Sequence, residues 1–163
     1  DRGPFAGMKQ PIWLNVGRVA VEKNIAAFLD TPLEGTKVIV GDGPQLEALK
    51  EKHKDAHFLG VKQGEELAAC FANADCFVFP SLTDTFGLVI LEAMAAGTPV
   101  AGFNVPGPRD LIPGSNAGAI SVGIMMIMLA LARSIGGKAR NSIATPTGVS
   151  MPPPMPWTTP PCN

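Results

Sequence analysis

Residues 80–97 read PSLTDTFGLVILEAMAAG, and this stretch largely decides the expected fold. The apolar segment just before it, 76–79, predicts a strand. The loop that follows is expected to turn at 84–87, and a helix is expected from about Leu88 to the terminating glycine Gly97.

Two acids flank the expected start of this helix. Asp84 lies in the loop, and Glu92, the only charged residue of the helix, lies one turn in, on the same face as Leu88. The backbone N–H groups of Phe86, Gly87 and Leu88 are donors of a helix N-terminus, which can bind a phosphate. Because a carboxylate on an apolar helix is costly to bury without a partner, we interpret the stretch as a pocket for a sugar joined to a diphosphate. The alternative is a cap acid at Asp84 and a buried salt-bridge partner at Glu92.

Short apolar strands alternate with helices through the first two thirds of the chain. The expected strands are 12–16, 36–40, 56–59, 76–79 and 98–101, and the expected helices between them are 24–29, 64–73 and one that starts near Pro44 and ends among the charges of 50–54. Strands that are apolar on both faces predict a parallel sheet with helices on both faces, an α/β, Rossmann-like fold. Ligands bind such sheets outside the carboxyl ends of the strands, so one edge is expected to carry the site.

The loops expected at this edge contain cations and glycines. Gly17 and Arg18 follow the first strand, with Lys23 shortly after, and Arg18 with Lys23 could clamp a phosphate. An Arg18–Glu22 pair on a solvated loop is the alternative. The loop after the second strand, Gly41-Asp42-Gly43-Pro44, lacks the third glycine of a dinucleotide-binding motif and is interpreted as a tight turn that lets a ligand approach the backbone.

The bulk composition suits a globular protein and excludes several classes. The chain has 163 residues, 46% hydrophobic and 17% charged, with a net charge of −1, so nothing favours nucleic acid as a partner. Cys70, Cys76 and Cys162 show no metal-binding spacing, and we expect the first two to be core thiols of a cytoplasmic protein. The apolar run 117–132 is shorter than the roughly 20 residues that span a bilayer, so no transmembrane segment is expected.

The composition changes near residue 113. All 14 acids lie at or before Asp110, whereas Arg133, Lys138 and Arg140 are the charged residues after it. We therefore expect a nucleotide-sugar-binding domain over 1–113 and, over 114–163, an atypical apolar helix with a proline-rich tail that is disordered or read from a shifted frame.

Four segments in fixed order resemble a known family. LNVGRVAVEKN, KVIVGDGP, HFLGV and PSLTDTFGLVILEAMAAGTPVAG are similar to the C-terminal, donor-binding half of retaining GT-B glycosyltransferases of the bacterial group 1 type. The resemblance covers about residues 11–112. It implies transfer of a mannose- or glucose-type hexose from a nucleotide sugar such as GDP-mannose or UDP-glucose, with retention and without a bound metal.

The resemblance also implies roles for single residues. Its paired-acid motif falls on Asp84 and Glu92, with aspartate where the family usually has glutamate, and Glu92 would hold the donor ribose. Arg18 and Lys23 would neutralise the diphosphate leaving group. The expected donor-binding positions are Gly17, Gly41, Asp42, Gly43, Pro44, Val61, Thr85, Phe86, Gly87 and Leu88, with Val61 bordering the base.

The resemblance implies a second domain that this sequence does not contain. An N-terminal domain would bind the acceptor, a sugar or a lipid, and the full-length parent could associate peripherally with the inner membrane. Two alternatives stay open: a non-catalytic nucleotide-binding fragment, and a GT-B type nucleotide-sugar epimerase.

Overall fold

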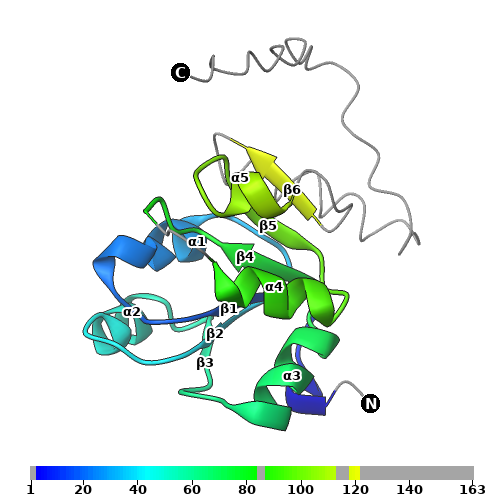
Figure 1. Cartoon of the computed structure of the whole chain (residues 1–163). Coiled ribbons are helices and arrows are strands. Elements are labelled where there is room, and N and C mark those ends of the chain that lie inside the picture. Colours follow the sequence, from blue (N-terminus) through cyan, green and yellow to red (C-terminus); the bar gives the residue numbers. More distant parts are fainter. Residues whose placement is uncertain (1–2, 84–86, 113–117, 122–163) are drawn as a thin grey trace, which may run out of the picture.

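The computed structural model describes residues 3–83, 87–112 and 118–121 (Figure 1). Within these residues the chain forms one six-stranded sheet in the order β3-β2-β1-β4-β5-β6, and all neighbouring strands are parallel. The strands are β1 Ile12–Val16, β2 Thr36–Val40, β3 His57–Phe58, β4 Cys76–Phe79, β5 Val100–Phe103 and β6 Gly118–Ser121. The expectation of a parallel α/β, Rossmann-like sheet is confirmed.

Helices cover both faces of the sheet. The α-helices are α1 Ile25–Asp30, α2 Leu46–Lys52, α3 Gly64–Asn73, α4 Leu88–Ala95 and α5 Pro108–Leu111, and the short 3-10 helices are η1 Gly3–Phe5 and η2 Val21–Lys23. In Figure 1, α4 crosses the near face of the sheet and η1 lies beside α3.

Successive strand residues enter two separate cores, which is why the strands read as unbroken apolar runs. On one face, Trp13, Ile39 and Val78 pack with residues of α1 and α2. On the other, Leu14 and Phe77 pack with residues of η1, α3, α4 and α5. The central side chains of both cores are buried, so the sheet is a rigid base for the loops at its carboxyl edge.

Most of the expected elements begin within one residue of the expected position, and two, β5 and α2, begin two residues later. β5 begins at Val100 rather than at Thr98, because Thr98 Oγ1 donates a hydrogen bond to the carbonyl oxygen of Phe71 at 2.6 Å. Thr98 thus ties α3 to the end of α4 instead of joining the sheet. Pro44 lies in a turn before α2 rather than in its first helical turn, because the Gln45 N–H donates to the carbonyl oxygen of Val19.

β6 was not expected from the sequence. Gly118 begins this strand, and a Cβ atom at its position would lie 2.0 Å from the Val100 carbonyl oxygen. A glycine therefore lets β6 approach β5 in a segment where an apolar helix was expected. The division of the chain at residue 113 stays a prediction, and most of 114–163 lies outside the described residues.

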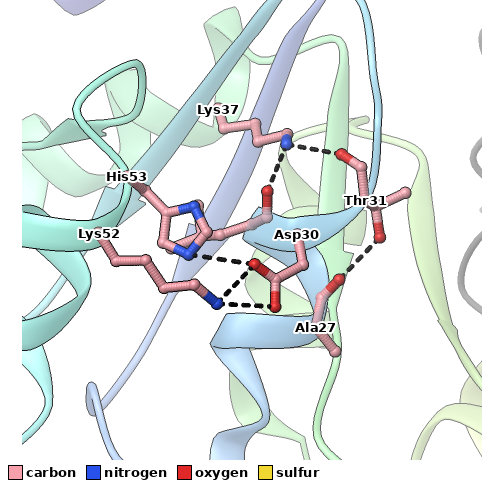
Figure 2. Close-up of polar contacts among 7 residues, drawn as sticks. Ala27, Asp30, Thr31, Lys37, Lys52 and His53 are labelled. Atoms are coloured by element: carbon pink, nitrogen blue, oxygen red, sulfur yellow. Dashed lines mark hydrogen bonds and ion pairs between the residues drawn. The ribbon is translucent and has the colours of Figure 1, made fainter.

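A cluster of charged side chains joins α1, α2 and β2 at the amino edge of the sheet (Figure 2). Lys37 of β2 is 9% exposed, and its Nζ donates to the carbonyl oxygens of Leu29 and Thr31, both at 2.6 Å. Lys52 Nζ pairs with Asp30 at 2.8 Å. Because Lys37 binds the carbonyl groups that end α1, the cluster stabilises helix ends and is remote from the opposite, carboxyl edge.

Candidate functional site

The strand order reverses direction between β1 and β4, and a cavity opens at the carboxyl ends of these two strands. Such reversal points are where parallel α/β sheets bind ligands. The cavity has a volume of about 340 Å³. It is lined by the end of β1 and the loop after it, the end of β4 and the start of α4: Asn15, Val16, Gly17, Arg18, Lys23, Phe79, Pro80, Ser81, Gly87, Leu88 and Val89. We call it the β1–β4 cavity.

A second cavity adjoins the first over the ends of β1 and β2. Its volume is about 290 Å³, and it shares Val16, Gly17 and Arg18 with the β1–β4 cavity. The remaining lining residues are Val40, Gly41, Asp42, Val61 and Lys62. We call it the β1–β2 cavity. Together the two cavities follow one edge of the sheet past Arg18, so an elongated ligand could occupy both.

The loop after β1 places two cations in the β1–β4 cavity. The exposed Arg18 side chain lies 3.6 Å from Glu22, which is the pair considered as an alternative from the sequence. Because exposed pairs of this kind contribute little, Arg18 can turn toward an anion at small cost. Lys23 ends η2 and is half-buried beside the same cavity. The structure therefore brings both predicted cations to one site.

The loops after β1 and β2 hold each other in place. The Gly17 N–H donates to the Val40 carbonyl oxygen at 2.9 Å, and the Val19 N–H donates to that of Asp42 at 2.8 Å. A Cβ atom on Gly41, whose φ is 140°, would lie 1.9 Å from the carbonyl oxygen of Gly17. The glycine at 41 is thus required by the chain's own backbone, whereas the sequence had suggested close approach of a ligand.

α4 presents its N-terminus to the β1–β4 cavity. Gly87 precedes the helix in a left-handed conformation, with φ 59° and ψ 47°, and both Gly87 and Leu88 line the cavity. Leu88 is 65% exposed. Glu92 lies one turn further along the same face and is also exposed, outside the residues that line either cavity. The argument that burial of Glu92 demands a partner is therefore wrong.

The predicted site residues fall into three groups. Those that line the two cavities are Gly17, Arg18, Lys23, Gly41, Asp42, Val61, Gly87 and Leu88. Those that line neither are Gly43, Pro44 and Glu92. Asp84, Thr85 and Phe86 lie outside the described residues.

The sequence did not point to Asn15, Ser81 or Lys62, which also line these cavities. Asn15 was the one polar residue in an apolar strand, which is a signal that could have singled it out. Ser81 and Lys62 carry no comparable signal, because serine and lysine are ordinary in loops.

Comparison with known proteins assigns the family. The model that describes "Glycosyl transferases group 1" matches residues 10–132, most of the chain. The chain belongs to the group 1 glycosyltransferases. It corresponds to the C-terminal-type domain of the GT-B fold, as the sequence resemblance had implied.

Two curated relatives of this glycosyltransferase chain share more than a third of the aligned residues. A sulfoquinovosyl transferase of Arabidopsis thaliana is 38% identical over 115 residues, which is 68% of this chain and 22% of the relative. A GDP-mannose-dependent alpha-mannosyltransferase of Corynebacterium glutamicum is 46% identical over 99 residues, covering 60% of this chain and 24% of that protein. The chain thus spans about a quarter of the length of these relatives.

A solved structure supports the same fold. The pneumococcal O-GlcNAc transferase, in complex with UDP and GlcNAc, is 25% identical with a TM-score of 0.62, over 79% of this chain and 29% of that one. In the described part of this glycosyltransferase chain, none of the helices has the length and apolar character needed to cross a bilayer.

The two described cysteines take no part in the site. Cys70 and Cys76 are fully buried, and burial raises the pKa of both thiols. This burial confirms the expectation that both are core thiols. A buried protonated thiol is unreactive.

Proposed function

We propose that this domain binds a nucleotide-sugar donor and contributes to transfer of its mannose- or glucose-type hexose to an acceptor with retention of configuration. One observation carries the proposal: Arg18, Lys23 and the N-terminus of α4 surround a single cavity at the point where the strand order reverses. Cations and helix N-termini both favour an anion, and the diphosphate bridge is the charged part of such a donor.

The proposed role of these groups is to stabilise the diphosphate as it leaves. As the bond between the sugar and the diphosphate breaks, negative charge grows on the phosphate oxygen that leaves. The Arg18 guanidinium and the Lys23 ammonium offset this charge, with the N–H groups at the start of α4 as fixed donors. In this proposal the protein's own cations carry the charge stabilisation, without a bound metal.

The two cavities suggest an orientation for the donor. The diphosphate and sugar occupy the β1–β4 cavity, and the base lies past Arg18 in the β1–β2 cavity, where Val61 is 59% exposed. Relatives and neighbours named for GDP-mannose or crystallised with UDP make GDP and UDP sugars the first candidates. The acceptor, a sugar or a lipid, would be bound by a further domain.

Calorimetry against a panel of nucleoside diphosphates tests donor binding. We expect GDP or UDP to bind, and Arg18→Ala and Lys23→Ala each to weaken binding about tenfold, as for loss of a charge-assisted contact. Lys54→Ala is the matched control, because Lys54 is an exposed lysine outside both cavities. Absence of binding by the wild-type chain, or equal losses in the control, would contradict the proposal.

Transfer itself needs a second experiment. A labelled donor is incubated with the chain, with and without the N-terminal domain of a relative. Transfer only with the added domain supports the assignment. Release of an epimerised sugar would instead favour the epimerase alternative.

A further inference from the structure

Asn15 bridges the two strands between which the β1–β4 cavity opens. Paired backbone positions of β1 and β4 extend to Leu14 and Phe77. Beyond this pair, Asn15 Nδ2 donates a hydrogen bond to the carbonyl oxygen of Val78 at 2.9 Å. A carbonyl oxygen only accepts hydrogen bonds, so the amide must present its NH₂ group to Val78. The orientation of the Asn15 amide follows from this contact.

The other end of the amide is an acceptor that has no partner among the residues that the structure describes. Asn15 is 4% exposed, and its Oδ1 atom is buried and accepts no hydrogen bond from the residues that the structure describes. Asn15 also lines the β1–β4 cavity, together with Arg18, Lys23 and the start of α4. Buried polar atoms are almost always hydrogen-bonded, so an unsatisfied acceptor in a cavity wall calls for a donor in the ligand.

We propose that Asn15 Oδ1 accepts a hydrogen bond from a hydroxyl group of the donor's transferred sugar. The inference rests on the proposed function. The diphosphate cannot be the partner, because ionised phosphate oxygens only accept hydrogen bonds. The base is remote, because Asn15 lines the β1–β4 cavity and not the β1–β2 cavity that contains Val61. The ribose hydroxyls are donors too, but the family resemblance assigns them to Glu92, which lies outside both cavities. The hydroxyls of the transferred sugar are then the donors that remain on the ligand.

The amide suits this position better than a carboxylate would. An Asn side chain accepts a hydrogen bond without bringing a negative charge next to a diphosphate. A pocket that hydrogen-bonds a substrate hydroxyl also discriminates against an analogue that lacks it, because the pocket's acceptor is then left unpaired. Asn15 would therefore be a specificity residue for the sugar.

Two substitutions separate the ligand contact from the structural one. Asn15→Leu and Asn15→Asp both lose the hydrogen bond to Val78, but Asn15→Asp keeps an acceptor oxygen. The measured quantity is the ratio of the Kd for a nucleoside diphosphate to the Kd for its hexose conjugate. We expect Asn15→Leu to lower this ratio about threefold to tenfold, the usual effect of one neutral hydrogen bond. Asn15→Asp should weaken both ligands through charge repulsion and leave the ratio near that of wild type.

Deoxy sugars provide a test that needs no variant to fold. Conjugates that each lack one sugar hydroxyl are titrated against the wild-type chain, and we expect one of them to bind about threefold to tenfold more weakly. Equal binding of all these conjugates would overturn the inference. An equal loss for diphosphate and conjugate in Asn15→Leu would also overturn it, because the contact would then lie outside the sugar. Wild-type chain that binds neither ligand would refute the proposed function as well.

Discussion

The Asn24 side chain ties the loop after β1 to the loop after β4. Its Nδ2 donates a hydrogen bond to the carbonyl oxygen of Pro80 at 3.2 Å. Asn24 itself adopts a left-handed conformation, with φ 54° and ψ 31°, between η2 and α1. Ser81 Oγ adds a second bridge to the carbonyl oxygen of Glu22 at 3.4 Å. These contacts set the position of Lys23 relative to the end of β4, and hence the shape of the β1–β4 cavity.

Replacing Asn24 should affect stability and binding in different ways. Asn24→Ala loses the bridge to Pro80 and places alanine in a left-handed conformation, so we expect a loss of about 2 kcal/mol in the free energy of unfolding. Asn24→Gly loses the bridge but accepts the conformation, so its loss should be about 1 kcal/mol or less. Both should weaken nucleoside diphosphate binding to a similar extent. Urea denaturation and calorimetry measure the two effects, and wild-type affinity in both variants would refute the positioning role of the bridge.

Gly41→Ala should be strongly destabilising. The added Cβ atom would meet the Gly17 carbonyl oxygen at 1.9 Å, and the backbone of this interlocked pair of loops cannot move without breaking its hydrogen bonds. We expect a loss of about 3 kcal/mol or more in the free energy of unfolding. Gly60→Ala is the matched control, because Gly60 also has a positive φ, 69°, but an added Cβ would have no atom within 4 Å. Similar losses for the two variants, measured by chemical denaturation, would show that steric contact is not the cause.

Glu92→Ala should weaken binding of GDP or UDP more than Asp84→Ala does. The expectation follows from the ribose contact that the family resemblance implies for Glu92. Since Glu92 is exposed, its removal should leave the free energy of unfolding within about 0.5 kcal/mol of wild type. Calorimetry on the three proteins measures the affinities. For 2′-deoxy nucleotides, wild type and Glu92→Ala should have the same affinity, because the ribose contact is then absent from both. Three equal affinities would exclude this role for Glu92.

Acid should destabilise the charged cluster at the amino edge. Hydrogen bonds from Lys52 hold the pKa of Asp30 below its usual value, with a further contribution from the charge of His53. A carboxyl whose pKa is lower in the folded state stabilises the fold above its unfolded pKa, about 4, and this contribution is lost as the pH falls through the folded pKa. Asp30→Asn should therefore show a shallower loss of unfolding free energy than wild type between about pH 5 and 2.

The effect should be modest, because the Asp30 side chain is 51% exposed. Glu47→Gln is the control for loss of one negative charge, since Glu47 pairs with Lys50 on the surface of α2. Denaturant titrations at a series of pH values compare the three proteins. Identical pH profiles for wild type and Asp30→Asn would rule out the proposed contribution.

The local patterns were sufficient to predict most of the sheet and its helices. The strands at Ile12–Val16, Thr36–Val40 and Cys76–Phe79 and the helix at Gly64–Asn73 lie where they were expected. Each is a run whose apolar residues enter one or both cores, so its pattern is visible in the sequence. The edge of the sheet at which the candidate site lies followed from the same pattern, because parallel strands share their carboxyl edge.

Tertiary structure alone decided which residues of that edge meet. The sequence could not predict that Gly41 is required by the Gly17 carbonyl group or that Glu92 is exposed. Nor could it predict that Asn15 bridges β1 and β4 and leaves its buried Oδ1 without a hydrogen-bond partner among the described residues. The spacing of apolar residues in the sequence indicates which face of its own helix or strand a residue occupies. What lies opposite depends on the strand order, and strands adjacent in the sheet, such as β1 and β4, are more than sixty residues apart in the chain.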